Sequence, residues 1–396
     1  MREAGAGRSW RAGWARRAAL VVVALATGVF GPSPGDALPL FSRRTGLGCD
    51  ACHDATPRLN ARGLEYLAHG YRFVSDPQPA HPRSVPVSAI ASVGYGVARL
   101  DSIDTPHVDR DGGDQRERES VVELHTAGSA HGRASWHLQE RIGTRTGMLD
   151  TPSAWAQLDD LAPGAVLNLR AGRFTTGLPF LVESRRTTLS PYSTPVTLDV
   201  RGLELNGTTH AWTYAGGLVE NHRALPDDES PAARAFTHLQ DTYAWVSRAL
   251  GAQRLGVRVW FDRQDSDLPF HTWLQHMQHE VAGSFTIRSL QVIPAYVLDR
   301  YDDRPAAELH DKHHDAMLEV VAPVDRARRW LVSGRYEHEY RTGTPFSPEW
   351  DRQHAALDLA FDPRPDTRVA LEWSHAADNV GGPRTDALDA YFRVGY

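Results

Sequence analysis

The stretch Trp330-Leu331-Val332-Ser333-Gly334-Arg335-Tyr336-Glu337-His338-Glu339-Tyr340 changes character from one residue to the next. In an extended chain, successive side chains point to opposite faces. One face of this stretch is therefore largely apolar, and the other carries Ser333, Arg335, Glu337 and Glu339. The pattern predicts a β-strand that separates a charged environment from an apolar one.

The same period of two residues recurs from Val87 to Tyr396. In residues 253–263, for example, apolar residues alternate with Arg254 and Arg258. The period predicts about sixteen strands, at residues 87–101, 117–130, 132–142, 153–160, 164–174, 199–209, 210–221, 238–249, 253–263, 271–282, 284–300, 311–322, 327–341, 350–361, 366–378 and 384–396.

The connections between these segments alternate in length. Short turns are expected near His131, Pro163, Gly207, Gly251, Gly283, Val324 and Pro365, and long connections at 102–116, 175–198 and 222–237. Short turns at one end, long loops at the other and an even number of strands are typical of bacterial outer-membrane barrels. We therefore expect residues 87–396 to form a mainly β fold, an antiparallel, porin-like outer-membrane β-barrel of about sixteen strands embedded in a lipid bilayer.

A soluble β-sandwich or a water-soluble barrel is the alternative. It explains any single strand equally well, because it also has one buried apolar face and one polar face. It explains less well a dozen or more strands that share a charged face without a second core. The chain also ends on Tyr396, an aromatic residue that closes an alternating strand, which resembles the terminal signal of outer-membrane barrels.

Residues 1–37 have the features of a secretory signal peptide. An Arg pair precedes an apolar run from Ala18 to Phe30, and Gly35 and Ala37 stand where a signal peptidase prefers small residues. A membrane anchor, the alternative, would need about 20 apolar residues. Removal of this peptide makes the chain more acidic than its formal net charge of −6, which argues against nucleic acid as a partner.

Both cysteines of the chain lie in Cys49-Asp50-Ala51-Cys52-His53. This spacing is typical of a covalently attached c-type haem, in which two thiolates bind the macrocycle and the histidine binds the iron. A redox disulfide would normally lie on a βαβ scaffold, a zinc site would need about four ligands, and a structural disulfide would leave His53 unexplained. The motif predicts one covalent haem c, held by Cys49 and Cys52, with His53 as the proximal iron ligand.

Residues 38–82 are expected to form a small, mainly helical haem segment. Pro57 stands where a helix can begin, and leucines recur at helical spacing from Leu59 to Leu67. A proline-rich linker then leads to the barrel. About forty residues bury too little surface to enclose a haem alone, so the haem should lean on another part of the chain.

Three stretches of this segment resemble the haem-binding head of a known family. They are Leu40-Phe41-Ser42-Arg43-Arg44-Thr45-Gly46-Leu47-Gly48-Cys49-Asp50-Ala51-Cys52-His53, Pro57-Arg58-Leu59-Asn60-Ala61-Arg62-Gly63 and Gly70-Tyr71-Arg72-Phe73. They are similar to the fused monohaem cytochrome c–porin proteins, which are outer-membrane electron-transfer proteins of iron-oxidising and related bacteria. The run from Leu169 to Phe174, with Gly177-Leu178-Pro179, is porin-like in a looser way.

The resemblance implies electron transfer across the outer membrane, with the haem segment at the periplasmic side or in the barrel lumen. The implied partners are a periplasmic c-type cytochrome and an extracellular donor or acceptor such as a metal ion, with ferrous iron as one candidate. An iron:cytochrome c oxidoreductase is the narrowest form of this hypothesis. Two alternatives stay open, namely a porin for solute passage whose haem segment is a plug or sensor, and a haem enzyme, for which the sequence offers no distal acid–base motif.

The sixth ligand of the iron is open at this point. His69 lies near the end of the helical stretch and could fold back over the haem as the distal ligand, or it could be a solvent-facing residue at the helix end. His81 and the methionines Met148, Met277 and Met317 are further candidates.

Two groups of charged residues follow from the barrel hypothesis. Arginines on the charged faces should line the lumen, where they either bind haem propionates or balance Glu123, Glu204, Glu337 and Glu339; they are Arg133, Arg141, Arg170, Arg254, Arg258, Arg335 and Arg393. Acidic residues are expected in external loops, where they either attract a metal cation or are simply solvated. Examples are Asp101, Asp104, Asp109, Asp111, Asp114, Asp227, Asp228, Glu229, Asp299, Asp302 and Asp303.

Overall fold

The computed structural model describes residues 41, 44–48, 51–55, 58–73, 87–101, 114–130, 133–143, 149–162, 166–181, 187–194, 196–221, 241–265, 273–304, 309–342, 349–364, 367–379 and 384–395. Asp36–Tyr396 form one compact unit. The expected signal peptide and linker lie outside the described residues. No helix among the described residues has the length and apolar character needed to cross a membrane.

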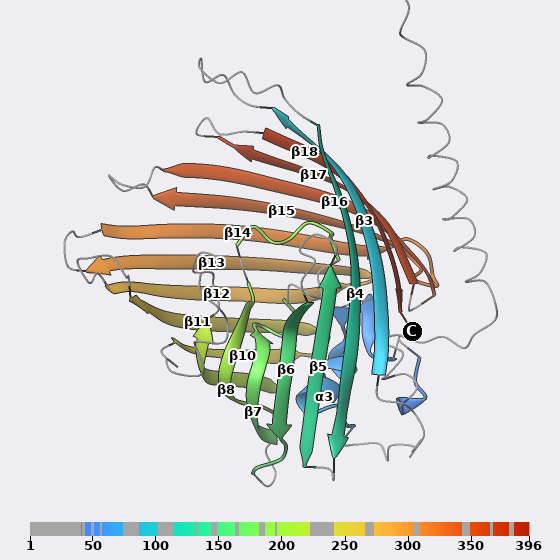
Figure 1. The fold of residues 1–396 in the computed structure, drawn as a ribbon, viewed down its shortest axis with the longest axis vertical. Helices are drawn as coiled ribbons and strands as arrows, with labels where there is room; N and C mark the ends of the chain where they lie inside the picture. The colour runs from blue at the N-terminus through green and yellow to red at the C-terminus, as the bar shows by residue number, and fades with distance from the viewer. Residues whose placement is uncertain are drawn as a thin grey trace, which may run out of the picture. The chain divides into compact units, whose positions relative to one another are not determined.

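Sixteen antiparallel strands close into a barrel (Figure 1). In chain order they are β3 (Val87–Asp101), β4 (Asp114–Ala130), β5 (Ala134–Gly143), β6 (Leu149–Leu158), β7 (Val166–Thr176), β8 (Leu198–Thr209), β9 (Trp212–Asn221), β10 (Asp241–Leu250), β11 (Gln253–Asp265), β12 (Trp273–Ile287), β13 (Leu290–Arg304), β14 (Leu309–Pro323), β15 (Trp330–Thr342), β16 (Trp350–Arg364), β17 (Thr367–Asp378) and β18 (Arg384–Gly395). Pairing of β18 with β3 completes the circle. Each strand overlaps one of the segments expected from the two-residue period, so the barrel prediction is confirmed.

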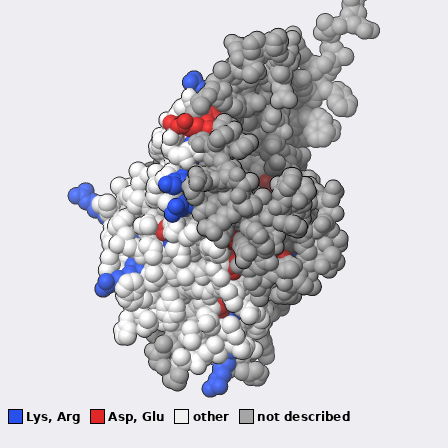
Figure 2. All heavy atoms as spheres, turned by 90° about the vertical axis from the view of Figure 1, so that its left-hand side faces the viewer, with Lys and Arg blue, Asp and Glu red and all other residues white. Residues whose placement is uncertain are grey.

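The barrel is apolar outside and charged inside. On β11, Val259 is 46% exposed, whereas the neighbouring Arg258 is 1% exposed. The same alternation holds on β15, where Tyr336 is exposed and Glu337 is buried. On the face in Figure 2, most described atoms belong to residues without a charge, and Lys, Arg, Asp and Glu lie at scattered points. A soluble sandwich would bury the apolar face, so this arrangement excludes it and marks the exterior as a lipid-facing surface.

Connections of unequal length alternate around the barrel, as expected, but two turns were placed wrongly. Gly207 lies inside β8 and Gly283 lies inside β12. A Cβ on Gly283 would stand 2.5 Å from the Phe285 ring, so this glycine makes room for a side chain within the strand. The turns are formed instead at His210 and Arg288, non-glycine residues with φ of 51° and 58°.

A small segment, here called the head, precedes the barrel and comprises the described residues from 41 to 73. It contains a two-stranded antiparallel pair, β1 (His53–Ala55) with β2 (Arg58–Leu59), and the helix α3 (Ala61–Ala68). The expected helix start at Pro57 is therefore wrong, because residues on both sides of it pair as strands. The helix begins after Asn60, whose side-chain oxygen accepts a hydrogen bond from the Gly63 N–H at 3.0 Å, a typical N-cap.

The lipid-facing assignment can be tested on β11. Val259→Arg should destabilise the barrel in lipid by about 2–4 kcal/mol, because a charge near the middle of the apolar band loses its hydration. Val259→Leu, the matched control, should change little. The measurement is the urea midpoint of the barrel in lipid vesicles. Equal midpoints for the two variants would contradict a lipid-facing Val259.

Candidate functional site

The cysteine motif forms a tight turn at the start of the head. The Ala51 N–H donates to the Gly48 carbonyl at 3.1 Å, and Cys52 follows with a half-buried side chain. Burial raises the pKa of the Cys52 thiol, and the nearby Arg62 guanidinium opposes this only in part. Cys49 lies outside the described residues, so the structure places one of the two predicted attachment points.

Helix α3 holds this turn in place. The Asn60 N–H donates to the Cys52 carbonyl at 2.9 Å, and the Asn60 side-chain amide donates to the Ala51 carbonyl at 3.2 Å. Gly63 permits the close approach, since a Cβ at this position would stand 2.3 Å from the Cys52 carbonyl oxygen. The N-terminus of the helix therefore fixes where Cys52 and His53 lie.

His53 has the hydrogen bond that an iron-binding histidine needs. Its Nδ1 lies 3.2 Å from the Arg58 carbonyl oxygen across the β1–β2 pair. A metal-bound histidine normally donates one ring N–H to such an acceptor, which orients the other nitrogen toward the metal. The geometry of His53 fits its expected role as the proximal ligand.

The surroundings of the turn also fit a bound macrocycle. Phe41, Leu47 and Leu67 pack with Cys52 and Tyr66 in one apolar cluster. The Tyr66 hydroxyl is buried without a hydrogen-bond partner among the described residues, and burial raises the pKa of Tyr66 to about 12. An orphaned buried donor fits a bound group with acceptor oxygens, such as a haem propionate. The residues present therefore fit a haem c.

His69 is the C-cap of α3 and is buried, which rules out the expectation of a solvent-facing residue. Its backbone N–H donates to the Glu65 carbonyl at 3.0 Å. Its Nδ1 is buried and has no hydrogen-bond partner within the described ranges. Burial lowers the pKa of His69, and the Asp160 carboxylate offsets this only in part. Burial thus favours the neutral imidazole, the form that binds metals. His81 lies outside the described residues.

A buried ion pair joins the head to the barrel wall. Arg58 Nη2 lies 2.7 Å from Glu319 Oε1 on β14, and the two side chains are 3% and 0% exposed. Glu319 also accepts hydrogen bonds from the Thr187 hydroxyl at 2.5 Å and from the Tyr192 hydroxyl at 3.0 Å. The carboxylate is therefore fully engaged, and it links the head to a segment that connects β7 and β8.

Further contacts bind the head to β4–β7, on one side of the lumen. The Asn168 amide donates to the Ala68 carbonyl at 2.8 Å, and Arg72 Nη2 lies 2.9 Å from Asp160 Oδ2. Gly70, with φ of +62°, packs so closely that a Cβ would stand 2.5 Å from the Asp159 carboxylate. Arg44 reaches Ser129 at the end of β4. The head thus sits inside the barrel.

Aromatic rings continue this interface. Tyr71 stacks on Phe41 of the head at a centroid distance of 4.7 Å and on Trp155 of β6 at 5.8 Å. His137 of β5 lies 6.0 Å from Trp155, ring to ring. The apolar cluster of the head is therefore continuous with the lumen wall, as expected for a segment too small to enclose a haem alone.

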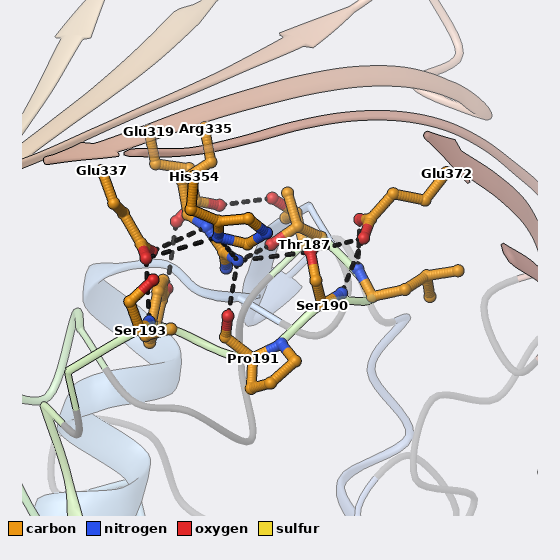
Figure 3. Close-up of polar contacts among 12 residues, drawn as sticks. Thr187, Ser190, Pro191, Ser193, Glu319, Arg335, Glu337, His354 and Glu372 are labelled. Carbon is orange, nitrogen blue, oxygen red and sulfur yellow. Dashed lines mark hydrogen bonds and ion pairs between the residues drawn. The ribbon is translucent and has the colours of Figure 1, made fainter. Parts of the chain in front are cut away.

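The long connection between β7 and β8 folds inward (Figure 3). The Ser190 N–H donates to Glu372 at 2.7 Å, and the Ser193 N–H donates to Glu337 at 2.8 Å. Arg335 donates to the Pro191 carbonyl at 2.6 Å. The sequence predicted the length of this connection but not its inward course. Its apolar residues Leu178, Leu181 and Val196, all buried here, were the available signal.

Four of the expected lumen arginines are paired with carboxylates, which agrees with charge balance. Arg141 lies 2.9 Å from Glu123, Arg335 lies 2.8 Å from Glu337, Arg258 lies 2.8 Å from Glu280, and Arg170 pairs with Glu204. Two expectations were wrong. Arg133 is exposed at a turn, and Asp299 is not in a loop but faces the lumen from β13, 3.0 Å from His276.

Asp302 and Asp303 also belong to β13 rather than to a loop, because this strand extends further than its periodicity suggested. Asp101 and Asp114 likewise belong to strands, as the last residue of β3 and the first residue of β4. The other acidic residues expected in loops lie outside the described residues; they are Asp104, Asp109, Asp111, Asp227, Asp228 and Glu229. Met317 is buried on the lumen side of β14, and Met148 lies outside the described residues.

A closed sixteen-stranded barrel with an apolar exterior and a charged lumen defines a porin-like membrane barrel. The comparisons with solved structures agree. A loop L8 deletion mutant of OmpT, an outer membrane protein of Vibrio cholerae, has a TM-score of 0.56 at 11% identity and covers 78% of this chain and 99% of its own. The anion-selective porin of Comamonas acidovorans has a TM-score of 0.56 at 10% identity, with the same coverage.

OprB of Pseudomonas putida is similar as well, with a TM-score of 0.53 at 10% identity over 78% of this chain and 94% of its own. At such identities the likeness is one of fold. No family model and no curated protein sequence matches the chain. The resemblance to fused cytochrome–porin proteins accordingly rests on the sequence motifs of the head alone.

The Arg58–Glu319 pair gives a test of head docking. Arg58→Ala should reduce the free energy that holds the head against the barrel wall by about 3–5 kcal/mol, because it leaves a buried carboxylate without its cation. The double change Arg58→Met with Glu319→Gln should recover much of this loss. Limited proteolysis of the head in an intact barrel measures the effect. Arg141→Ala, which removes a lumen arginine that is 43% exposed, should leave the head protected, and equal protection in Arg58→Ala would refute the docking role.

His69 gives a test by pH. Its pKa is lower in the docked head than in the unfolded chain, so the unfolded chain takes up the proton first as the pH falls. The stability that the neutral imidazole contributes should therefore be present above about pH 6.5 and be lost below it. In protein made in cells that do not attach haem, so that no iron occupies the imidazole, the urea midpoint of head release should fall between pH 7.5 and 5, and His69→Gln should flatten that fall. Parallel curves for the two proteins would show that His69 does not titrate in this way.

Proposed function

We propose that this chain is a monohaem c-type cytochrome fused to an outer-membrane barrel, and that it passes electrons across the bacterial outer membrane. In this proposal Cys49 and Cys52 hold one covalent haem, His53 is the proximal ligand of the iron, and His69 is the distal one. The observation that supports it best is that the cysteine turn lies in a head fastened inside the barrel by the buried Arg58–Glu319 pair. A head built only for assembly would not need such a fixed position.

The chain's own residues would hold and shield the group. Asn60 and Gly63 fix the cysteine turn against α3, and the Arg58 carbonyl orients the His53 ring. The aromatic cluster around Tyr66 and Tyr71 keeps water from this side of the turn. When bound, the haem supplies a one-electron redox centre whose potential depends on the second axial ligand.

The placement of the head favours a periplasmic partner. Its contacts with Ser129, Ser135 and Asp160 lie beside the short connections β4–β5 and β6–β7. In outer-membrane barrels the short turns face the periplasm, so the haem would lie within reach of a periplasmic c-type cytochrome. One macrocycle cannot span an apolar band about 25 Å tall. The extracellular donor or acceptor, such as ferrous iron, therefore has to enter the lumen from the long-loop end.

A porin for solute passage, with the head as a plug or sensor, is the second candidate. The similarity in fold to solved porins favours it more directly than it favours electron transfer. The β7–β8 connection, here called the inward loop, leaves a pocket of about 480 Å³ between itself and β15–β18. Part of the lumen therefore stays open. The two candidates differ in what crosses the membrane, and that difference can be measured.

Electron passage can be tested in liposomes that hold the full-length protein and a trapped cytochrome c. Ferrous iron added outside should reduce the trapped acceptor, because the haem would connect the lumen to the inner mouth. His53→Ala should remove at least about 90% of the initial rate, since the iron loses its proximal ligand. The measurement is the absorbance of the trapped cytochrome in a stopped-flow instrument.

A solute-leak assay with the same liposomes separates the two candidates. Both proteins should release a small trapped sugar at the same rate, which shows that the barrel has formed in each. Equal reduction rates at equal leak rates would contradict electron transfer through the haem and would favour the porin.

A further inference from the structure

Two acidic residues face each other across neighbouring strands in the lumen. Asp315 of β14 is the direct cross-strand partner of Glu339 of β15, and Glu337 lies two positions away on the same face. One carboxylate oxygen from each of the three lies within 4.8 Å of the other two, and all three residues are buried. Like charges directly opposite each other destabilise a strand pair, and shielding by water is weak in a buried site. The repulsion must therefore be relieved, either by a proton on one carboxylate or by a cation.

Neighbouring groups supply a positive charge to one member of the cluster. Glu337 lies 2.8 Å from Arg335 Nε and 3.5 Å from His354 Nδ1, and it accepts a hydrogen bond from the Ser193 N–H at 2.8 Å (Figure 3). Asp315 is 4% exposed, and the buried Thr194 hydroxyl interacts with its carboxylate. Even so, Asp315 Oδ1 has no partner with ordinary hydrogen-bond geometry among the described residues. A buried carboxylate oxygen without a donor requires an explanation such as an ion.

A histidine nitrogen lies beside one of the carboxylates. His313 Nε2 is 3.9 Å from Glu339 Oε2, and in the described part of the chain this nitrogen is buried without a hydrogen-bond partner. The pocket of about 480 Å³ is lined by Glu339, Ser193 and His354, so an ion from the lumen can reach the cluster at Glu339. The cluster is thus accessible from the lumen.

We infer that Asp315, Glu337 and Glu339 bind a divalent metal cation, and that His313 is a neighbour of the site on its Glu339 side. Carboxylate oxygens suit Mg²⁺, Ca²⁺ and Mn²⁺. The cation offsets the repulsion between Asp315 and Glu339 and occupies the open oxygen of Asp315. The site is built from the barrel alone and does not depend on the haem.

Mn²⁺ titrated into the full-length protein in detergent, with free Mn²⁺ followed by electron paramagnetic resonance, tests the inference. The wild-type protein should bind one Mn²⁺ at this site, and Asp315→Asn or Glu339→Gln should weaken binding by about tenfold or more. Glu123→Gln is the matched control, because it also changes a lumen carboxylate to an amide but at a residue paired with Arg141; it should bind Mn²⁺ as the wild type does. Unchanged binding in Asp315→Asn would overturn the inference.

Thermal unfolding of the same variants shows whether a loss of Mn²⁺ binding comes from a lost ligand or from a folding defect. In EDTA, Asp315→Asn should unfold at or above the wild-type temperature, because it removes an uncompensated charge. Mn²⁺ should raise the unfolding temperature of the wild type and leave that of Asp315→Asn unchanged. A wild-type protein that Mn²⁺ does not stabilise, together with a lower unfolding temperature for Asp315→Asn in EDTA, would show that a proton rather than a metal resolves the repulsion.

Discussion

A lipid bilayer offers no partner for backbone N–H and C=O groups, so every such group in it must be bonded within the protein. The pairing of β18 with β3, and of β9 with β10, removes the edges that an open sheet would expose. Once the sheet is closed, the period of two residues determines which side chains face outward and which face inward. Apolar side chains face lipid, and the charged set faces the lumen, where arginines and carboxylates neutralise each other.

A barrel of this width would leave an aqueous channel if nothing filled it. Here two segments share the lumen, namely the head and the inward loop between β7 and β8, and both bind carboxylates of the barrel wall. The head binds Glu319 through Arg58, and the inward loop binds the same residue through Thr187 and Tyr192. Loop backbone groups also bind Glu337 and Glu372. The charged face of the strands is thus the surface on which the lumen contents are assembled, and Glu319 is the point at which the two meet.

Much of this could be predicted from the sequence, because strand periodicity and the haem motif are local signals. The sixteen strands follow from alternation alone. Spacing alone singles out Cys52 and His53, and their role in binding haem stays a prediction. The features that could not be predicted are turn conformations and contacts between residues far apart in the sequence. The turns at His210 and Arg288 use non-glycine residues in a left-handed conformation. A prediction that places turns at glycines therefore misses both of them. The Arg58–Glu319 contact joins residues 261 positions apart, and no local pattern encodes it. The burial of His69 depends in the same way on the barrel wall beside it.

The central claim is that the head held in this lumen carries one covalent haem, and the attached group can be measured directly. The protein should be purified from the outer membranes of cells that attach haem, extracted with acid acetone and examined by intact mass and visible spectroscopy. We predict one haem per chain that survives extraction, bound through Cys49 and Cys52. A folded, membrane-inserted barrel recovered from such cells with two unmodified thiols would contradict the account.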